Sequence, residues 1–323
     1  MRAHLITFLQ KFAKNPFILV TLIMVFYVAL ALYIDVGKLS ITSVRIDYLT
    51  IPLILIPMTL AILVLGYRFH RFLWSLNIKI PLKKSILIYV TGLAFAVTPV
   101  GSGQVIRSQI IKKQFGFAAS KTSPIFLIEK WNELNAALLI LVFSALVESM
   151  LESSLISIIG LVLALFIFSI MRNQLLFGIL RKVILKFPRL KVLEQSVEIS
   201  RDALKHLTSR TAVLEGFIFT VPAMILQAVS VFFVFHALGI KISFVTSTQI
   251  FYVALISGVL SFIPGGLVVT EASMLGLLIK YYDHDVRLLA TSVIIIRFVT
   301  VWYPTLMGIL TSQFLIKYKQ KST

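Results

Sequence analysis

The feature that most constrains the fold of this chain is a series of long uncharged segments. The first, residues 17–34, runs 18 residues without a charged side chain. The others are residues 49–67, 85–106, 134–147, 153–171, 216–240, 242–270 and 288–316, the last interrupted by Arg297. About 20 apolar residues let a helix cross a bilayer. With 59% hydrophobic and 14% charged residues, the 323-residue chain predicts an all-α polytopic membrane protein.

Two of these segments contain helix breakers and differ from simple spans. In each, an apolar half-length stretch is interrupted by Pro and Gly and then followed by a second short helix-like stretch. Irregular backbone is not tolerated against lipid, so each break is expected to be enclosed by protein or to line a cavity. The predicted break residues are Pro99, Gly101 and Gly103 in the first segment and Pro264, Gly265 and Gly266 in the second.

The distribution of basic residues predicts the orientation. If both broken segments are re-entrant hairpins, 24 of the 31 Lys and Arg residues, including the five of residues 67–84 that begin with Arg68, fall on one side and only 5 on the other. Cytoplasmic loops carry the excess of Lys and Arg, so both termini are predicted to be cytoplasmic in a cell-membrane protein. The N-terminus also resembles a signal peptide, but residues 17–34 are long enough to span, which favours an uncleaved first helix.

The two predicted hairpins enter from opposite faces, and each precedes a full span. The predicted fold is therefore about six full spans plus two oppositely oriented broken hairpins, forming an inverted repeat of the kind found in secondary transporters. The alternative is that Pro and Gly kinks are common in membrane helices and the likeness is coincidence. We expect a single domain over residues 1–323, with repeat cores at 85–147 and 242–316 and a cytoplasmic basic loop at 172–212.

Six ionisable side chains lie within or at the ends of these segments. Each costs roughly 2.5–3.5 kcal/mol at a helix centre, and six unrelieved groups would cost about 15–20 kcal/mol. They are therefore expected to converge on one polar interior that binds the substrate. The residues are Arg107, Glu129, Lys130, Glu133, Glu271 and Arg297, and polar Gln104 and Thr270 accompany them.

Specific pairings follow from the spacing. Glu129 and Glu133 are four residues apart on one helix face, so a cation is expected between them, and Arg297 is a candidate. A structural ion pair between helices is the alternative. Gln104 and Arg107 follow the first break, where a half-helix N-terminus and a guanidinium fork suit a lipid phosphate. Arg107 could instead extend toward the interface. Glu271 is expected to balance Arg297 or to take up a proton.

Several function classes lack sequence support. The +18 charge lies between apolar runs, so nucleic-acid binding is not predicted. No cysteine is present, the five histidines form no metal-spaced pair, and no nucleotide-binding or nucleophile motif occurs, so no catalytic residue, metal or cofactor is assigned. Apolar residues recur near heptad spacing in the basic loop, from Leu190 to Leu207, which favours an amphipathic helix on the anionic leaflet over a partner-binding helix.

At the two breaks the sequence resembles a known family. The segments Thr98-Pro99-Val100-Gly101-Ser102-Gly103-Gln104-Val105-Ile106-Arg107, Ile128-Glu129-Lys130, Ile263-Pro264-Gly265-Gly266-Leu267-Val268-Val269-Thr270-Glu271-Ala272 and Ile296-Arg297 are similar to the flippase-like membrane domain of lysylphosphatidylglycerol synthases. The family often has Gly at Val100 and Val268, Glu at Gln104 and Arg at Lys130. The resemblance implies lipid translocation, while lysyl transfer belongs to a separate catalytic domain of those synthases.

Together these features predict a flippase-like transporter that moves a phospholipid or a polyprenyl-phosphate-linked lipid between leaflets. Two alternatives stay open. One is a membrane enzyme acting on a lipid head group, with Glu129 and Glu133 as acid and base. The other is a non-transporting subunit that docks a cytoplasmic glycosyltransferase or synthase through residues 172–212.

Overall fold

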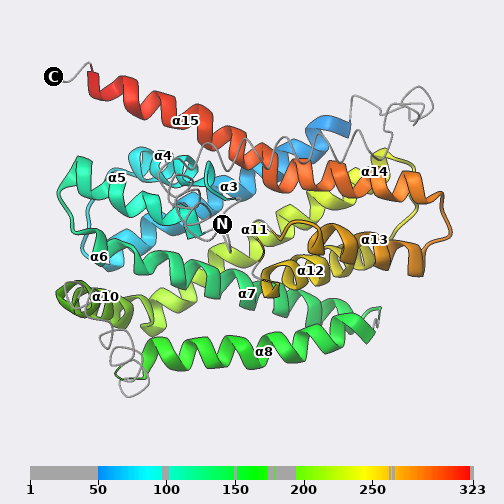
Figure 1. Ribbon diagram of the computed structural model, residues 1–323, viewed down its shortest axis with the longest axis horizontal. Coiled ribbons are helices and arrows are strands. Elements are labelled where there is room, and N and C mark those ends of the chain that lie inside the picture. Colours follow the sequence, from blue (N-terminus) through cyan, green and yellow to red (C-terminus); the bar gives the residue numbers. More distant parts are fainter. Residues whose placement is uncertain are drawn as a thin grey trace, which may run out of the picture.

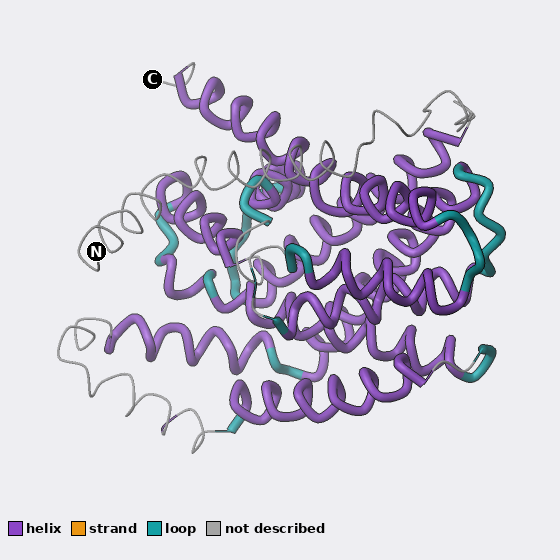
Figure 2. The backbone as a smooth tube through the Cα atoms, turned by 45° about the vertical axis from the view of Figure 1, so that its right-hand side comes forward, coloured by secondary structure: helices purple, strands orange, loops and turns teal. Residues whose placement is uncertain are grey.

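The computed structural model describes residues 50–96, 102–148, 151–173, 178, 194–261, 263 and 266–320. Within these ranges the chain is helical and contains no strand (Figure 1 and Figure 2). The predicted span at residues 17–34 lies outside the described residues. The helices are α3 (Thr50–Ser75), α4 (Leu82–Leu93), η1 (Ser102–Val105), α5 (Ile106–Phe115), α6 (Ala119–Thr122), α7 (Pro124–Ala145), α8 (Leu151–Arg172), α10 (Glu194–Leu207), α11 (Arg210–Ala237), α12 (Phe244–Leu260), α13 (Val269–Tyr281), α14 (Val286–Arg297), the π-helix η3 (Phe298–Trp302) and α15 (Tyr303–Gln320).

Three described helices are long and apolar enough to cross a membrane: Thr50–Ser75, Arg210–Ala237 and Val286–Gln313. Two shorter apolar helices cover Leu155–Ser169 and Phe244–Leu260. The long helices run roughly along the longest axis of the molecule (Figure 1). Seven apolar side chains of α8, among them Ile158, Val162 and Leu165, are more than half exposed, as expected where lipid rather than water is the solvent. The chain is therefore a membrane-embedded helical protein.

Both segments predicted to break do leave the helical path. α4 ends at Leu93, and the next described helix is η1, which contains Gly103; Pro99 and Gly101 lie outside the described residues. α12 ends at Leu260 and α13 begins at Val269. Pro264 and Gly265 also lie outside the described residues. In Figure 1 the pair α4 and α5 lies toward one end of the molecule, and the pair α12 and α13 toward the other.

A close backbone approach explains two small residues at the second break. Gly266 adopts a φ of +65°, which is easy only without a Cβ. A Cβ on Gly258 or on Gly266 would collide with the Thr270 hydroxyl. Thr270 itself is 1% exposed. Thr270 therefore fixes how closely the two arms of this broken pair approach.

Hydrogen bonds between connecting segments show which loops lie near one another. On one side, the Ser200 hydroxyl of α10 donates to the Ser120 carbonyl of α6 at 2.9 Å. On the other, the Ser243 hydroxyl before α12 donates to Glu148, after α7, at 2.9 Å. Burial raises the pKa of Tyr282, after α13, and the nearby Glu148 carboxylate acts in the same direction. Residues 148, 243 and 282 thus lie together.

Helix α10 differs from the expected leaflet-bound helix. Its apolar residues Ala203, Leu204 and Leu207 are buried, and the helix packs against α6 and α7 (Figure 1). This apolar face is therefore covered by the protein and is not free to enter lipid. Leu190 and Leu193 lie outside the described residues.

Helix α3 is longer than the uncharged run that predicted it. The apolar pattern continues through Phe69, Phe72 and Leu73, so the helix extends to Ser75. Arg68, which the sequence placed in a cytoplasmic basic segment, is instead fully buried inside this helix. That correction matters for the site, because it adds a cation to the interior.

Candidate anion site

Arg107 is held at the start of the half-helix after the first break. Its Nε donates to the Gln104 carbonyl at 3.0 Å, which fixes the side chain along the η1–α5 turn. The aliphatic part lies on Gly92 of α4, where a Cβ would come within 2.6 Å of the Arg107 Cγ and Cδ. Gly92 therefore provides the space that the arginine stem occupies. The residue is 3% exposed.

Glu129 of α7 faces the Arg107 fork. Arg107 Nη1 and Nη2 donate to the two carboxylate oxygens at 3.2 and 2.5 Å. Such bidentate pairs are among the strong, geometrically specific hydrogen bonds of proteins. Both side chains are buried, at 4% and 1% exposure. The guanidinium thus pairs with a planar anion in a site that excludes most water.

Arg68 is a second buried cation beside the same carboxylate. Its Nη2 lies 3.7 Å from Glu129 and 2.9 Å from Glu133. Its Nη1 donates to the Thr220 hydroxyl of α11 at 2.7 Å. The cation between the two carboxylates is therefore Arg68, and the expectation that Arg297 takes this position is wrong.

Lys130 completes the cluster at its more exposed edge. Lys130 Nζ lies 2.6 Å from Glu133 Oε2, and the two side chains are 29% and 26% exposed. We call Arg68, Arg107, Glu129, Lys130 and Glu133 the first ion cluster. It contains three cations and two carboxylates.

Aromatic rings enclose the Arg107 guanidinium. Its Cζ lies 4.8 Å from the ring centre of Phe69 and 5.0 Å from that of Tyr89. Aromatic faces attract a guanidinium without neutralising it. These rings therefore stabilise the position of the cation and leave its charge available to an anion.

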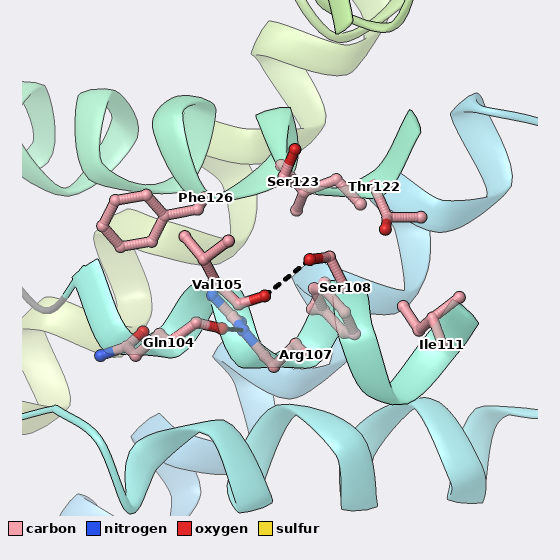
Figure 3. Close-up of a pocket in the computed structure, with 10 residues that line it drawn as sticks. Gln104, Val105, Arg107, Ser108, Ile111, Thr122, Ser123 and Phe126 are labelled. Atoms are coloured by element: carbon pink, nitrogen blue, oxygen red, sulfur yellow. Dashed lines mark hydrogen bonds between the residues drawn. The ribbon is translucent and has the colours of Figure 1, made fainter. Parts of the chain in front are cut away.

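A small cavity opens beside Arg107 (Figure 3). Gln104, Arg107 and Ser108 line it from η1 and α5, and Thr122 and Ser123 face them from the α6–α7 side. The Ser108 hydroxyl donates to the Val105 carbonyl at 2.7 Å. The cavity has room for about one water molecule. Polar groups therefore converge here, but a head group needs the surrounding helices to separate.

A second buried pair lies at the other break. Arg297 Nε of α14 donates to Glu271 Oε1 of α13 at 2.8 Å, and the side chains are 3% and 14% exposed. The predicted balance of Glu271 by Arg297 is confirmed. The π-helix η3 begins directly after Arg297. Single π-turns inside α-helices are frequent at functional sites.

A family comparison fits these positions. The model of the lysylphosphatidylglycerol synthase TM region matches residues 17–308. The chain belongs to this family. It is thus a membrane protein related to lipid modification or transport. Searches of curated proteins and of solved structures returned no match.

The contacts among the described residues bring the predicted site residues together in two groups. Arg107, Glu129, Lys130 and Glu133 join the first ion cluster, whose cavity Gln104 also lines. Glu271 and Arg297 form the second pair, and Thr270 packs at the break beside them. No described cluster of three His, Cys, Asp or Glu residues could hold a metal ion.

Arg68 is the residue that the sequence argument missed. It was counted as a loop cation because it ends an uncharged run. The signal that could have identified it is the spacing of Leu65, Phe69, Phe72 and Leu76, all buried, which continues a helical apolar face past Arg68.

Proposed function

We propose that this family member translocates an anionic lipid, a phospholipid or a polyprenyl-phosphate-linked lipid, between the leaflets of the cell membrane. The observation that carries the proposal is Arg107: a buried, aromatic-enclosed guanidinium fork on a half-helix, bordering a polar cavity. A guanidinium fork matches two oxygens of a phosphate as it matches two oxygens of a carboxylate. The family, which is related to lipid modification or transport, supports the lipid as ligand.

The proposed route uses an inverted repeat. The pairs α4–α5 and α12–α13 lie toward opposite ends of the molecule, and each half-helix after a break carries one member of a buried ion pair (Figure 1). Substrate sites between broken helices near the bilayer midplane are typical of secondary transporters. We propose that rocking of the two halves opens the closed cavity at Arg107 first to one leaflet and then to the other.

The orientation in this proposal places the basic loops in the cytoplasm. The links after α3, α5 and α8 then face the cytoplasm with both termini, and the links after α7, α11 and α13 face outward. The excess of Lys and Arg in the first set supports this assignment.

The enzymatic alternative has less support. Glu129 and Glu133, its candidate acid and base, are both engaged by arginine or lysine. A carboxylate held as the counter-ion of a buried arginine is poorly placed to exchange a proton with a substrate.

The test is transport of a fluorescent phosphatidylglycerol by the full chain in vesicles, followed by quenching of the label in the outer leaflet. We expect the wild type to equilibrate the label and Arg107→Ala to lose most of this activity. Arg71→Ala is the control, because Arg71 pairs with Glu215, which is not a residue of the cluster, at 33% exposure. Absence of transport by the wild type, or equal rates in Arg107→Ala, would contradict the proposal.

A further inference from the structure

The first ion cluster has an uncompensated charge. Arg68, Arg107 and Lys130 are three cations, whereas Glu129 and Glu133 supply two negative charges. One formal positive charge is therefore left among these five residues. Each cation has a carboxylate oxygen within 3 Å, but the five charges together do not cancel. A ligand with one negative charge would make the cluster neutral.

Glu129 is shared between two arginines in an unequal way. It forms a bidentate pair with Arg107 at 3.2 and 2.5 Å, whereas Arg68 Nη2 is 3.7 Å away. Arg68 is fully buried, yet its Nε has no hydrogen-bond partner among the described residues. A buried donor without an acceptor is an unstable arrangement. Arg68 is thus able to engage an acceptor more fully than it does in this state.

Arg107 is built to keep its place when its partner changes. The Gln104 carbonyl holds Nε, the rings of Phe69 and Tyr89 hold the guanidinium, and Gly92 accommodates the stem. None of these contacts involves Glu129. The position of the fork therefore does not depend on which anion occupies it.

We propose that Glu129 occupies the ligand position on Arg107, and that Arg68 receives Glu129 when a phosphate takes this position. The proposal rests on the function proposed above and assigns Arg68 as a positioning residue. No covalent bond changes; one ion pair replaces another. Because Glu129 always keeps an arginine, the exchange avoids a bare carboxylate in the membrane interior. The ligand chemistry is a phosphate ester with a single negative charge.

The experiment measures binding to the full chain in nanodiscs by competition with a labelled lipid. The membrane probes are phosphatidylglycerol, phosphatidic acid and diacylglycerol, and the soluble probes are glycerophosphoglycerol and inorganic phosphate. We expect phosphatidylglycerol, a phosphate diester with one negative charge, to bind more tightly than phosphatidic acid, a phosphate monoester, or diacylglycerol, which is uncharged. Equal binding of soluble glycerophosphoglycerol would identify the phosphate ester itself, without acyl chains, as the ligand.

The variants test the exchange. Glu129→Gln removes the internal competitor and is expected to tighten phosphatidylglycerol binding about tenfold, whereas Arg68→Gln, which leaves Glu129 on Arg107, weakens it by a similar factor. In the double variant the effect of Arg68→Gln should largely disappear. A merely structural Arg68 would weaken binding in both backgrounds. Arg71→Gln is the control, because Arg71 lies on the same helix, α3, but pairs with Glu215. This variant should leave binding unchanged.

The outcomes separate the two proposals. Unchanged or weaker binding in Glu129→Gln would overturn the exchange while leaving lipid binding intact. Equal losses from Arg68→Gln with and without Glu129 would also overturn it. If Arg68→Gln does not fold, Arg68→Lys replaces it and should weaken binding less. Absence of binding by the wild type to every probe would contradict the proposed function, and the exchange with it.

Discussion

The two broken regions of the molecule carry the same kind of ion pair with the charges reversed. At the first, the half-helix α5 supplies Arg107 and the following long helix α7 supplies Glu129. At the second, the half-helix α13 supplies Glu271 and the following helix α14 supplies Arg297. Among the described residues, the second region shows one ion pair, Glu271 with Arg297, whereas the first pair belongs to a five-residue cluster with three cations and two carboxylates. The difference suggests that ligand selection belongs to the first region.

The packing around the two pairs also differs. At the first break a glycine, Gly92, makes room for the stem of the charged residue itself. At the second, Gly258 and Gly266 make room for Thr270, the neighbour of the charged residue. Small residues thus set the approach of the arms in both regions, but only at the first do they position a cation directly.

The largest expected effect is at the first pair. Arg107→Ala leaves Glu129 with only the more distant Arg68, and loss of one partner of a buried ion pair costs about 3–5 kcal/mol of stability. Arg71→Ala, at a half-exposed pair, should cost at most about 1 kcal/mol. Unfolding in mixed detergent micelles measures both. Similar losses in the two variants would show that the first pair is not buried as described.

Charge exchange sharpens the contrast between the regions. The double variant Glu271→Arg with Arg297→Glu keeps one cation and one anion, so it should recover more than half of the stability that each single variant loses. The corresponding exchange of Arg107 and Glu129 would place an arginine beside Arg68 and should recover nothing. Equal recovery in both regions, measured by unfolding, would remove the asymmetry on which the comparison depends.

A smaller effect is expected at Gly92. Gly92→Ala forces the Arg107 stem to shift, and such overpacking costs about 1–3 kcal/mol. Proposed transport should fall although no charge changes. Gly276→Ala is the matched control, because a Cβ there meets nothing within 4 Å and should be neutral or stabilising by up to about 1 kcal/mol. Unfolding and transport assays measure the effect of both variants. Unchanged stability and transport in Gly92→Ala would contradict the close packing of the Arg107 stem against Gly92.

The smallest effect is expected at the edge of the first ion cluster. Lys130 and Glu133 are more than a quarter exposed, and Glu133 also pairs with Arg68. Lys130→Ala should therefore reduce stability by no more than about 1 kcal/mol. A loss as large as that of Arg107→Ala in the same unfolding assay would extend the buried site to Lys130.

Much of the fold follows from local sequence rules. Uncharged runs located α7, α8, α11 and the α14–α15 helix, and Pro–Gly clusters located both breaks, because length and breaker residues act locally. The ion pairing was harder. The pairing of Glu271 with Arg297 was predicted, but the pairing of Glu129 and Glu133 with Arg68 was not. Arg68 lies more than 60 residues away in the sequence, and its helix extends beyond the uncharged run. Which helices meet depends on long-range packing that no spacing rule contains.

The proposed opposite entry of the two broken pairs can be tested directly. The chain has no cysteine, so single-cysteine variants at Lys112 and Asp283, both exposed, have no background. With a membrane-impermeant maleimide on intact cells, we expect Asp283→Cys to react at once and Lys112→Cys to react only after permeabilisation. Reaction of both from the same side would contradict the inverted arrangement.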